Sequence, residues 1–166
     1  MDSTQGVNNQ VFQPSCGLKM VFWALVGAVL MIVLLISGRP LLFKDPESWQ
    51  CFRPYWIAFF FTAIAALFIL GLALIVMARR QTLEVKLRKY LLLTGLATAG
   101  FPACVILHNL VYGLFIVLFG ADFWERIGLG DEPVLFLLAI FVCPIAFLIG
   151  VVGSAILLLK RRDKQI

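Results

Sequence analysis

Four long apolar stretches dominate the pattern of hydrophobic and polar positions along this chain. They cover residues 18–37, 57–77, 90–120 and 133–159, and no polar group interrupts the first one from Met20 to Ile36. A bilayer core about 30 Å thick is crossed by about 20 apolar residues in a helix that rises about 1.5 Å per residue. Each stretch is long enough, so the pattern predicts four transmembrane helices.

The connections between these stretches are short and carry local helix signals. Residues 45–47 read Asp-Pro-Glu, which predicts a helix start with Asp45 as the N-cap, Pro46 at the first helical position and an acid in the first turn. We expect a brief interfacial helix through residues 49–51 before Pro54 opens the second span. Residues 82–90 also read as helical, and we expect them to extend the third helix beyond the membrane rather than form a separate domain.

Two prolines lie inside the apolar stretches, Pro102 in the third and Pro144 in the fourth. Proline removes one backbone hydrogen bond, so a kink is expected at each position. The sequence therefore predicts an all-α membrane protein: a four-transmembrane-helix antiparallel bundle with short loops and Pro-kinked third and fourth helices. We expect one polytopic membrane domain between a polar segment, 1–17, and a basic tail, 160–166.

Composition supports this fold class. Hydrophobic residues make up 62% of the chain and charged residues only 14%, whereas ordinary soluble domains are roughly 45–50% apolar. A water-soluble fold cannot hide that much apolar surface. No cleavable signal is evident before the first stretch, so we expect that stretch to remain as a membrane anchor.

The basic residues are unevenly distributed over the connections. The N-terminal side, the connection between the second and third spans, and the C-terminal tail together carry ten Lys and Arg, against four in the two other loops. This bias predicts cytoplasmic N- and C-termini. Contact with anionic lipid head groups at the inner face is expected rather than binding of nucleic acid, for which no motif is present. The residues expected at the head groups are Arg79, Arg80, Lys86, Arg88, Lys89, Lys160, Arg161 and Arg162.

Candidate chemistry within the membrane is sparse, because no span has an Asp, Glu, Lys or Arg in its interior. The exception among ionisable groups is His108, with Asn109 and Tyr112 nearby and Cys104 one helical turn earlier. Cys143 on the fourth span lies at about the same depth as Cys104. These five residues form a possible polar intramembrane site. No cofactor is predicted, although two thiols and an imidazole are ligands that a soft metal or a haem iron accepts; His108 is otherwise expected to hydrogen-bond across a helix interface.

Small residues recur along one face of the fourth span. Such stripes allow helix backbones to approach closely in lipid. The third span has a shorter version with Gly95, Ala99 and Ala103. Packing within the four helices is the simpler interpretation, and association with another subunit is the alternative. The residues of the fourth-span stripe are Ala139, Cys143, Ala146, Gly150 and Ser154.

No nucleotide-binding loop, zinc-binding pair, nucleophile elbow or pair of catalytic carboxylates occurs in the sequence. The chain is therefore expected to be a non-catalytic membrane protein acting as a subunit or scaffold of a larger membrane complex. The alternative is a homo-oligomeric channel or facilitator lined by the third and fourth helices, with His108, Asn109 and Tyr112 as its polar lining. An enzyme or cofactor site built on His108 and the two cysteines ranks behind both.

Overall fold

The computed structural model describes residues 14–42 and 46–162, with the side chains of residues 38–49, 51, 161 and 162 left outside the description. Over these residues the chain is helical, with short connections and no strand. The elements, in order, are α1 (Cys16–Leu42), α2 (Pro46–Arg80), α3 (Val85–Phe119), α4 (Phe123–Arg126), α5 (Pro133–Leu137), the π-helical segment η1 (Leu138–Val142) and α6 (Cys143–Arg162).

Four of these helical stretches are long and apolar enough to cross a membrane. They are Cys16–Ser37, Phe52–Arg80, Val85–Phe119 and Pro133–Lys160. A lipid bilayer offers no water to exposed peptide groups, and a continuous helix satisfies its backbone hydrogen bonds within the segment that crosses the bilayer. The predicted all-α class with four membrane-spanning helices is confirmed, and the chain is a multi-pass membrane protein.

The beginning of α2 differs from the sequence-based expectation. The helix runs without a break from Pro46 through Pro54. The prediction of a separate interfacial helix before Pro54 is therefore wrong. A proline inside a helix sacrifices one backbone hydrogen bond, whereas ending the helix there exposes several. The expected first helical position, Pro46, is correct, while Asp45, expected as the N-cap, lies outside the described residues.

The prolines of the last two spans have different effects. The third helix continues through Pro102 as a single α-helix. The fourth span is interrupted, because η1 separates α5 from α6, which begins at Cys143 immediately before Pro144. The amide of Cys143 donates to the carbonyl of Leu138, five residues back instead of four. A widened turn of this kind accommodates the proline ring without ending the helix.

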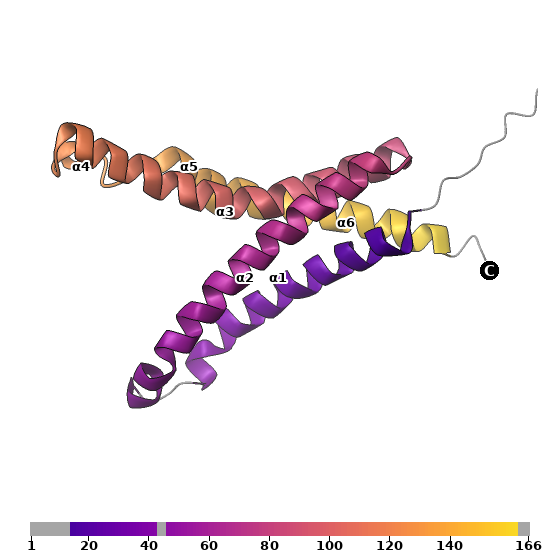
Figure 1. Ribbon diagram of the computed structural model, residues 1–166, viewed down its shortest axis with the longest axis horizontal. Coiled ribbons are helices and arrows are strands. Elements are labelled where there is room, and N and C mark those ends of the chain that lie inside the picture. Colours follow the sequence, from indigo (N-terminus) through magenta and orange to yellow (C-terminus); the bar gives the residue numbers. More distant parts are fainter. Residues whose placement is uncertain (1–13, 43–45, 163–166) are drawn as a thin grey trace, which may run out of the picture.

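The long helices form two antiparallel hairpins that diverge from one end (Figure 1). One hairpin is α1–α2; the other is α3 with α5, η1 and α6. The start of α1, the connection between α2 and α3 and the end of α6 gather at one end, which we call the basic end. The opposite ends of the hairpins, where α1 ends and α2 begins and where α4 and α5 lie, are far apart and are called the open end.

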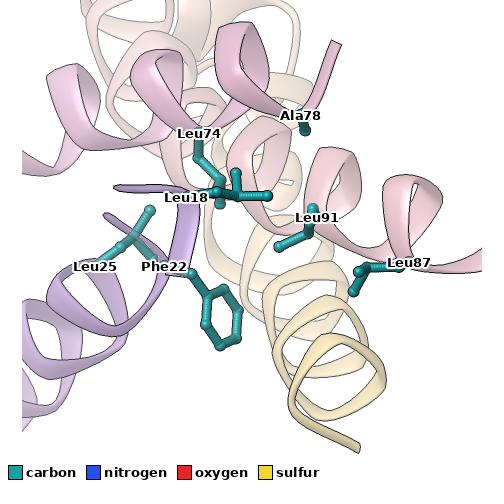
Figure 2. Close-up of a cluster of buried hydrophobic side chains, with 7 residues drawn as sticks. All are labelled: Leu18, Phe22, Leu25, Leu74, Ala78, Leu87 and Leu91. Atoms are coloured by element: carbon teal, nitrogen blue, oxygen red, sulfur yellow. The ribbon is translucent and has the colours of Figure 1, made fainter. Parts of the chain in front are cut away.

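A buried apolar cluster holds the hairpins together near the basic end. It combines side chains from α1, α2 and α3, and half-buried residues of α6 such as Phe147 and Val151 pack against it. Figure 2 shows the buried side chains converging between these helices. Its members are Leu18, Phe22, Leu25, Leu74, Ala78, Leu87 and Leu91.

Polar contacts close the α1–α2 hairpin at the same end. Ser15 caps α1, because its Oγ accepts a hydrogen bond from the amide of Leu18 at 3.2 Å. Gln81, just after α2, donates from Nε2 to Ser15 Oγ and accepts from the Ser15 amide at 3.0 Å. This pair of residues ties the start of α1 to the end of α2.

Candidate functional site

A cluster of polar side chains centres on His108, in the half of α3 that lies toward the open end. Its Nε2 lies 3.3 Å from an oxygen of Asp131, and its Nδ1 lies 3.3 Å from an oxygen of Glu132. The His108 side chain is only 14% exposed and that of Glu132 only 9%. Phe136 covers the imidazole, with ring centroids 5.8 Å apart. An imidazole donates from one nitrogen when neutral and from both when protonated, so only the protonated ring donates to both carboxylates.

Glu132 also starts the next helix. Its carboxylate accepts hydrogen bonds from the amides of Val134 and Leu135, each at 2.9 Å, while Pro133 occupies the first turn. The adjacent Asp131 accepts from the Glu132 amide at 2.7 Å. These local bonds orient the carboxylate toward His108. The same side chain therefore caps α5 and links it to α3.

The residues predicted to form a site with His108 make contacts elsewhere. Asn109 is exposed and donates to the carbonyl of Val105 in its own helix at 2.8 Å. Tyr112 stacks on Trp124, with ring centroids 5.8 Å apart, and its carbonyl accepts from the Trp124 indole at 3.3 Å. The structure thus brings His108 to Asp131 and Glu132, not to a site formed with Asn109 and Tyr112.

The two membrane cysteines lie at the interface of α3 and α6. Cys104 of α3 and Cys143 of α6 are half-buried free thiols, and Cys143 Sγ lies 3.6 Å from the position that a Cβ on Gly100 of α3 would take. Among the residues that the structure describes, no group of three or more His, Cys, Asp and Glu side chains is arranged to hold a metal ion. Because both ring nitrogens of His108 face carboxylates, a metal there would displace one of these contacts. A metal or haem role for His108 stays the less favoured hypothesis that it was in the sequence analysis, where no cofactor is predicted.

An aromatic cluster closes the tip of the α3–α6 hairpin. Trp124 of α4 is buried and packs against Phe115 and Phe123, with ring centroids 5.5 and 5.2 Å away. At the end of α3, Gly120 adopts a φ of 97°, which favours glycine, and Arg126 donates to the carbonyl of Phe119. The tip is therefore fixed by its own side chains.

The small residues predicted on the fourth span are buried or half-buried, and Gly150 makes a close contact with α3. Ala139, Gly150 and Ser154 are buried, and Ala146 is half-buried. A Cβ added at Gly150 would lie 2.5 Å from Thr94 Oγ1 and 2.7 Å from the Thr94 amide nitrogen. The backbones of α3 and α6 therefore touch here, as helices in lipid do at glycine.

A second close approach joins the two hairpins and was missed in the sequence. A Cβ on Gly71 of α2 would lie 2.9 Å from the Ala99 amide nitrogen and 3.0 Å from the Gly95 carbonyl oxygen, both on α3. Gly71 stands alone among larger apolar residues, so no stripe marked it. Its partners, Gly95 and Ala99, belong to the short stripe recognised in the third span.

The basic residues expected at lipid head groups lie around the basic end. Arg79 and Arg80 form the last turn of α2, and residues 86–89 lie in the first turns of α3. Lys160 lies near the end of α6, while Arg161 and Arg162 have side chains outside the description. The basic side chains within the description are exposed, so they are available to solvent or to head groups.

No protein-family model, no curated protein and no solved structure matches this chain. Function is therefore inferred from its own residues and their contacts.

Proposed function

We propose that this protein is a non-catalytic subunit of a membrane complex, and that its α1–α2 hairpin holds a transmembrane helix of a different polypeptide. The observation that carries the proposal is the exposure of three consecutive side chains of α2. Phe59, Phe60 and Phe61 are 43%, 37% and 67% exposed. Consecutive helical positions point about 100° apart, so most of the circumference of α2 is uncovered at this level.

The physics of helix association in lipid supports a protein occupant. Apolar surface alone does not drive helices together in a bilayer, because the lipid tails are equally apolar. Association depends on close side-chain and backbone packing, which α2 has at Gly71 toward the basic end. Toward the open end its bulky aromatic side chains, such as Tyr55 and Phe61, are exposed and can pack closely against another helix. Large rigid rings provide extensive contact at a low cost in conformational entropy.

The proposal places the basic end in the cytoplasm. Ten of the Lys and Arg residues belong to segments at this end by sequence, and positive charge is retained on the cytoplasmic side of membranes. Anionic head groups of the inner leaflet are then the natural contacts of Arg79, Arg80 and Lys89. Cys16 and Cys51 test this orientation, because an impermeant maleimide added outside intact cells should label Cys51 and spare Cys16. The reverse labelling would contradict it.

Site-specific photo-crosslinking tests the proposed partner. A benzophenone amino acid is introduced separately at Phe59, Phe60 and Phe61, and the cell's own membranes are irradiated. A bound helix covers only part of the circumference, so one or two positions should give the same discrete protein adduct and the remainder should give lipid adducts. Leu148 of α6, also exposed, is the matched control and should give lipid adducts.

The outcomes separate the alternatives. Lipid adducts at all three positions would contradict the proposal, since lipid surrounds the helix evenly. An adduct with the mass of two copies of this chain would mean that the bound helix belongs to a second copy of the chain and not to a different polypeptide. The homo-oligomeric channel stays a prediction, and no contact in the described residues favours it, because His108 faces Asp131 and Glu132 and Tyr112 is stacked on Trp124.

A further inference from the structure

His108 of α3 lies between two acidic side chains from the connection that precedes α5. Its Nε2 is 3.3 Å from Asp131 Oδ2, and its Nδ1 is 3.3 Å from Glu132 Oε2. The imidazole and the Glu132 side chain are largely buried, whereas the Asp131 side chain is 53% exposed. A neutral imidazole has one N–H donor and one lone pair, so it donates to only one carboxylate. With both carboxylates ionised, the two contacts together require the protonated ring.

Glu132 couples the imidazole to the beginning of the fourth span. Its carboxylate accepts hydrogen bonds from the amides of Val134 and Leu135, each at 2.9 Å. The group that faces His108 therefore also holds the first turn of α5. This helix has five residues and is followed directly by the π-helical segment η1. A π-helical turn interrupts the regular hydrogen-bond pattern of a helix, so α5 is a short element with a capping carboxylate at one end and a widened turn at the other.

Asp131 and Glu132 are the charged groups that face the imidazole. Residues 133–142, which form α5 and η1, include no titratable side chain. On the same face of α3, Cys104 and Tyr112 lie one turn to either side of the imidazole. Thiols, phenols and carboxylates ordinarily titrate outside the range from about pH 5 to about pH 8, in which histidine changes its charge. A change of pH within this range therefore acts on this site through the imidazole.

We propose that His108 is a pH-sensitive latch, which in its protonated form fastens the start of α5 to α3. When the ring loses its proton, its remaining donor stays with Glu132, because a buried carboxylate is costlier to leave without a donor than an exposed one. Asp131 then faces a lone pair and turns toward water. Asp131 also accepts from the Glu132 amide at 2.7 Å, so its release loosens the residue that caps α5, and the first turn opens more often. The latch lies in the α3–α6 hairpin and does not depend on the partner proposed for α1–α2.

The test uses the full chain in lipid nanodiscs, without a histidine tag, over the range from about pH 5 to about pH 8. His108 is the single histidine of the chain, so the nitrogen NMR signals of imidazole report its protonation alone. Hydrogen exchange of the amides of residues 134 and 135, relative to the unfolded peptide at the same pH, gives their protection. This protection should fall about tenfold as the pH rises, which is the effect of losing one hydrogen bond to a charged group. Its midpoint should coincide with that of the imidazole titration.

Three variants make the result specific. His108→Gln removes the titrating group, so its protection should be the same at both ends of the pH range. Asp131→Asn keeps an acceptor for the Glu132 amide, and its amide group can donate to the neutral ring, so most of the pH dependence should be lost. Because Asp131 is exposed, this variant provides the test if His108→Gln does not fold. Glu125→Gln is the control, since it changes an exposed carboxylate of α4 that is not one of the two facing His108, and it should keep the full pH dependence.

The outcomes that would overturn the proposal are equally specific. Constant protection of the unsubstituted chain over the whole range would contradict the latch. A midpoint that differs from that of the imidazole titration would assign the change to another group. Full pH dependence in His108→Gln or in Asp131→Asn, or its loss in Glu125→Gln, would exclude the arrangement of His108 between its two carboxylates as the cause.

Discussion

Near the basic end the helix backbones touch each other, whereas toward the open end side chains make the contacts and the two hairpins separate. Gly71 meets Gly95 and Ala99, and Gly150 meets Thr94, at distances that leave no room for a Cβ. Toward the open end, aromatic rings close one hairpin around Trp124, while rings on α2 such as Phe61 are exposed. Near the basic end, close backbone contact at Gly71 and the buried apolar cluster thus join the hairpins to each other. Toward the open end, bulky side chains cover or extend each hairpin individually.

This difference follows from how helices associate in lipid. The hydrophobic effect between helices is absent there, so association depends on contact area and on the shape of the surfaces. Glycine lets carbonyl and amide groups of two helices approach, and it provides contact without ordering a side chain. An aromatic side chain fills space equally well against a ring of its own hairpin or against another protein. The substitutions below test which contacts matter at each end, from the largest expected effect to the smallest.

Gly71→Ala should have the largest effect, because the added methyl group meets backbone atoms of α3 at 2.9 and 3.0 Å. Overpacking of this kind costs about 3 kcal/mol when the obstacle cannot move. The free energy of unfolding is measured by SDS titration in mixed micelles, with tryptophan fluorescence as the signal. Gly27→Ala is the control, since nothing lies within 4 Å of a Cβ at that position, and its change should be below about 0.5 kcal/mol. Equal effects of the two substitutions would show that the α2–α3 contact is not tight.

Trp124→Ala should destabilise the tip of the α3–α6 hairpin by about 2 kcal/mol. This destabilisation is smaller than for a tryptophan in the core of a soluble protein. Lipid or detergent solvates the newly exposed apolar surface well, so mainly packing contacts are lost. The melting temperature in detergent, followed by size-exclusion chromatography of heated samples, gives the loss. Trp23→Ala provides the contrast, because Trp23 is 46% exposed on α1. A drop as large for Trp23→Ala would contradict the importance of the aromatic cluster.

Glu132→Ala should loosen the start of α5 by about 1–2 kcal/mol, because it removes the cap of Val134 and Leu135 together with the contact to His108. Hydrogen exchange of the amides of residues 134 and 135 reports the opening. Glu132→Gln keeps one acceptor oxygen and should lose less than half as much protection. If Ala and Gln behave alike, the carboxylate contact with His108 carries the effect and the cap carries none.

Ser15→Ala and Gln81→Ala should have the smallest effects, about 0.5–1 kcal/mol each, because their hydrogen bonds are partly exposed to solvent. A double-mutant cycle measures their coupling by the same SDS titration. We expect the double variant to be less destabilised than the sum of the two single variants. Additive losses would mean that the two side chains act independently.

The sequence predicted the helices well because a membrane leaves few alternatives. An apolar run such as 18–37 must form a helix to satisfy its peptide groups in lipid, and α1 contains it entirely. The small residues of the fourth span were visible because they recur every three or four positions. Gly71 escaped notice, since a single glycine in an apolar run carries no periodic signal.

The surroundings of His108 were only partly predictable. Spacing along a helix placed His108 on the same face as Cys104 and Tyr112, but it gives no information about what the next connection brings to that face. The signal that was missed is local: Asp131, Glu132 and Pro133 form the same type of helix start that was recognised at residues 45–47. A capping carboxylate at the end of a short loop lies near the preceding helix, and in this protein it meets the imidazole.

Distances between spin labels would test the divergence of the hairpins most directly. One pair at Leu72 and Leu96 reports on the close approach of α2 and α3, and a second pair at Tyr55 and Leu114 lies about the same number of residues farther along each helix toward the open end; all four side chains are exposed. Measured by double electron–electron resonance in nanodiscs, the second distance should exceed the first by more than the diameter of a helix, about 10 Å. Equal distances for the two pairs would mean that the helices form a closed parallel-sided bundle, and would contradict both the open end and the partner helix proposed for it.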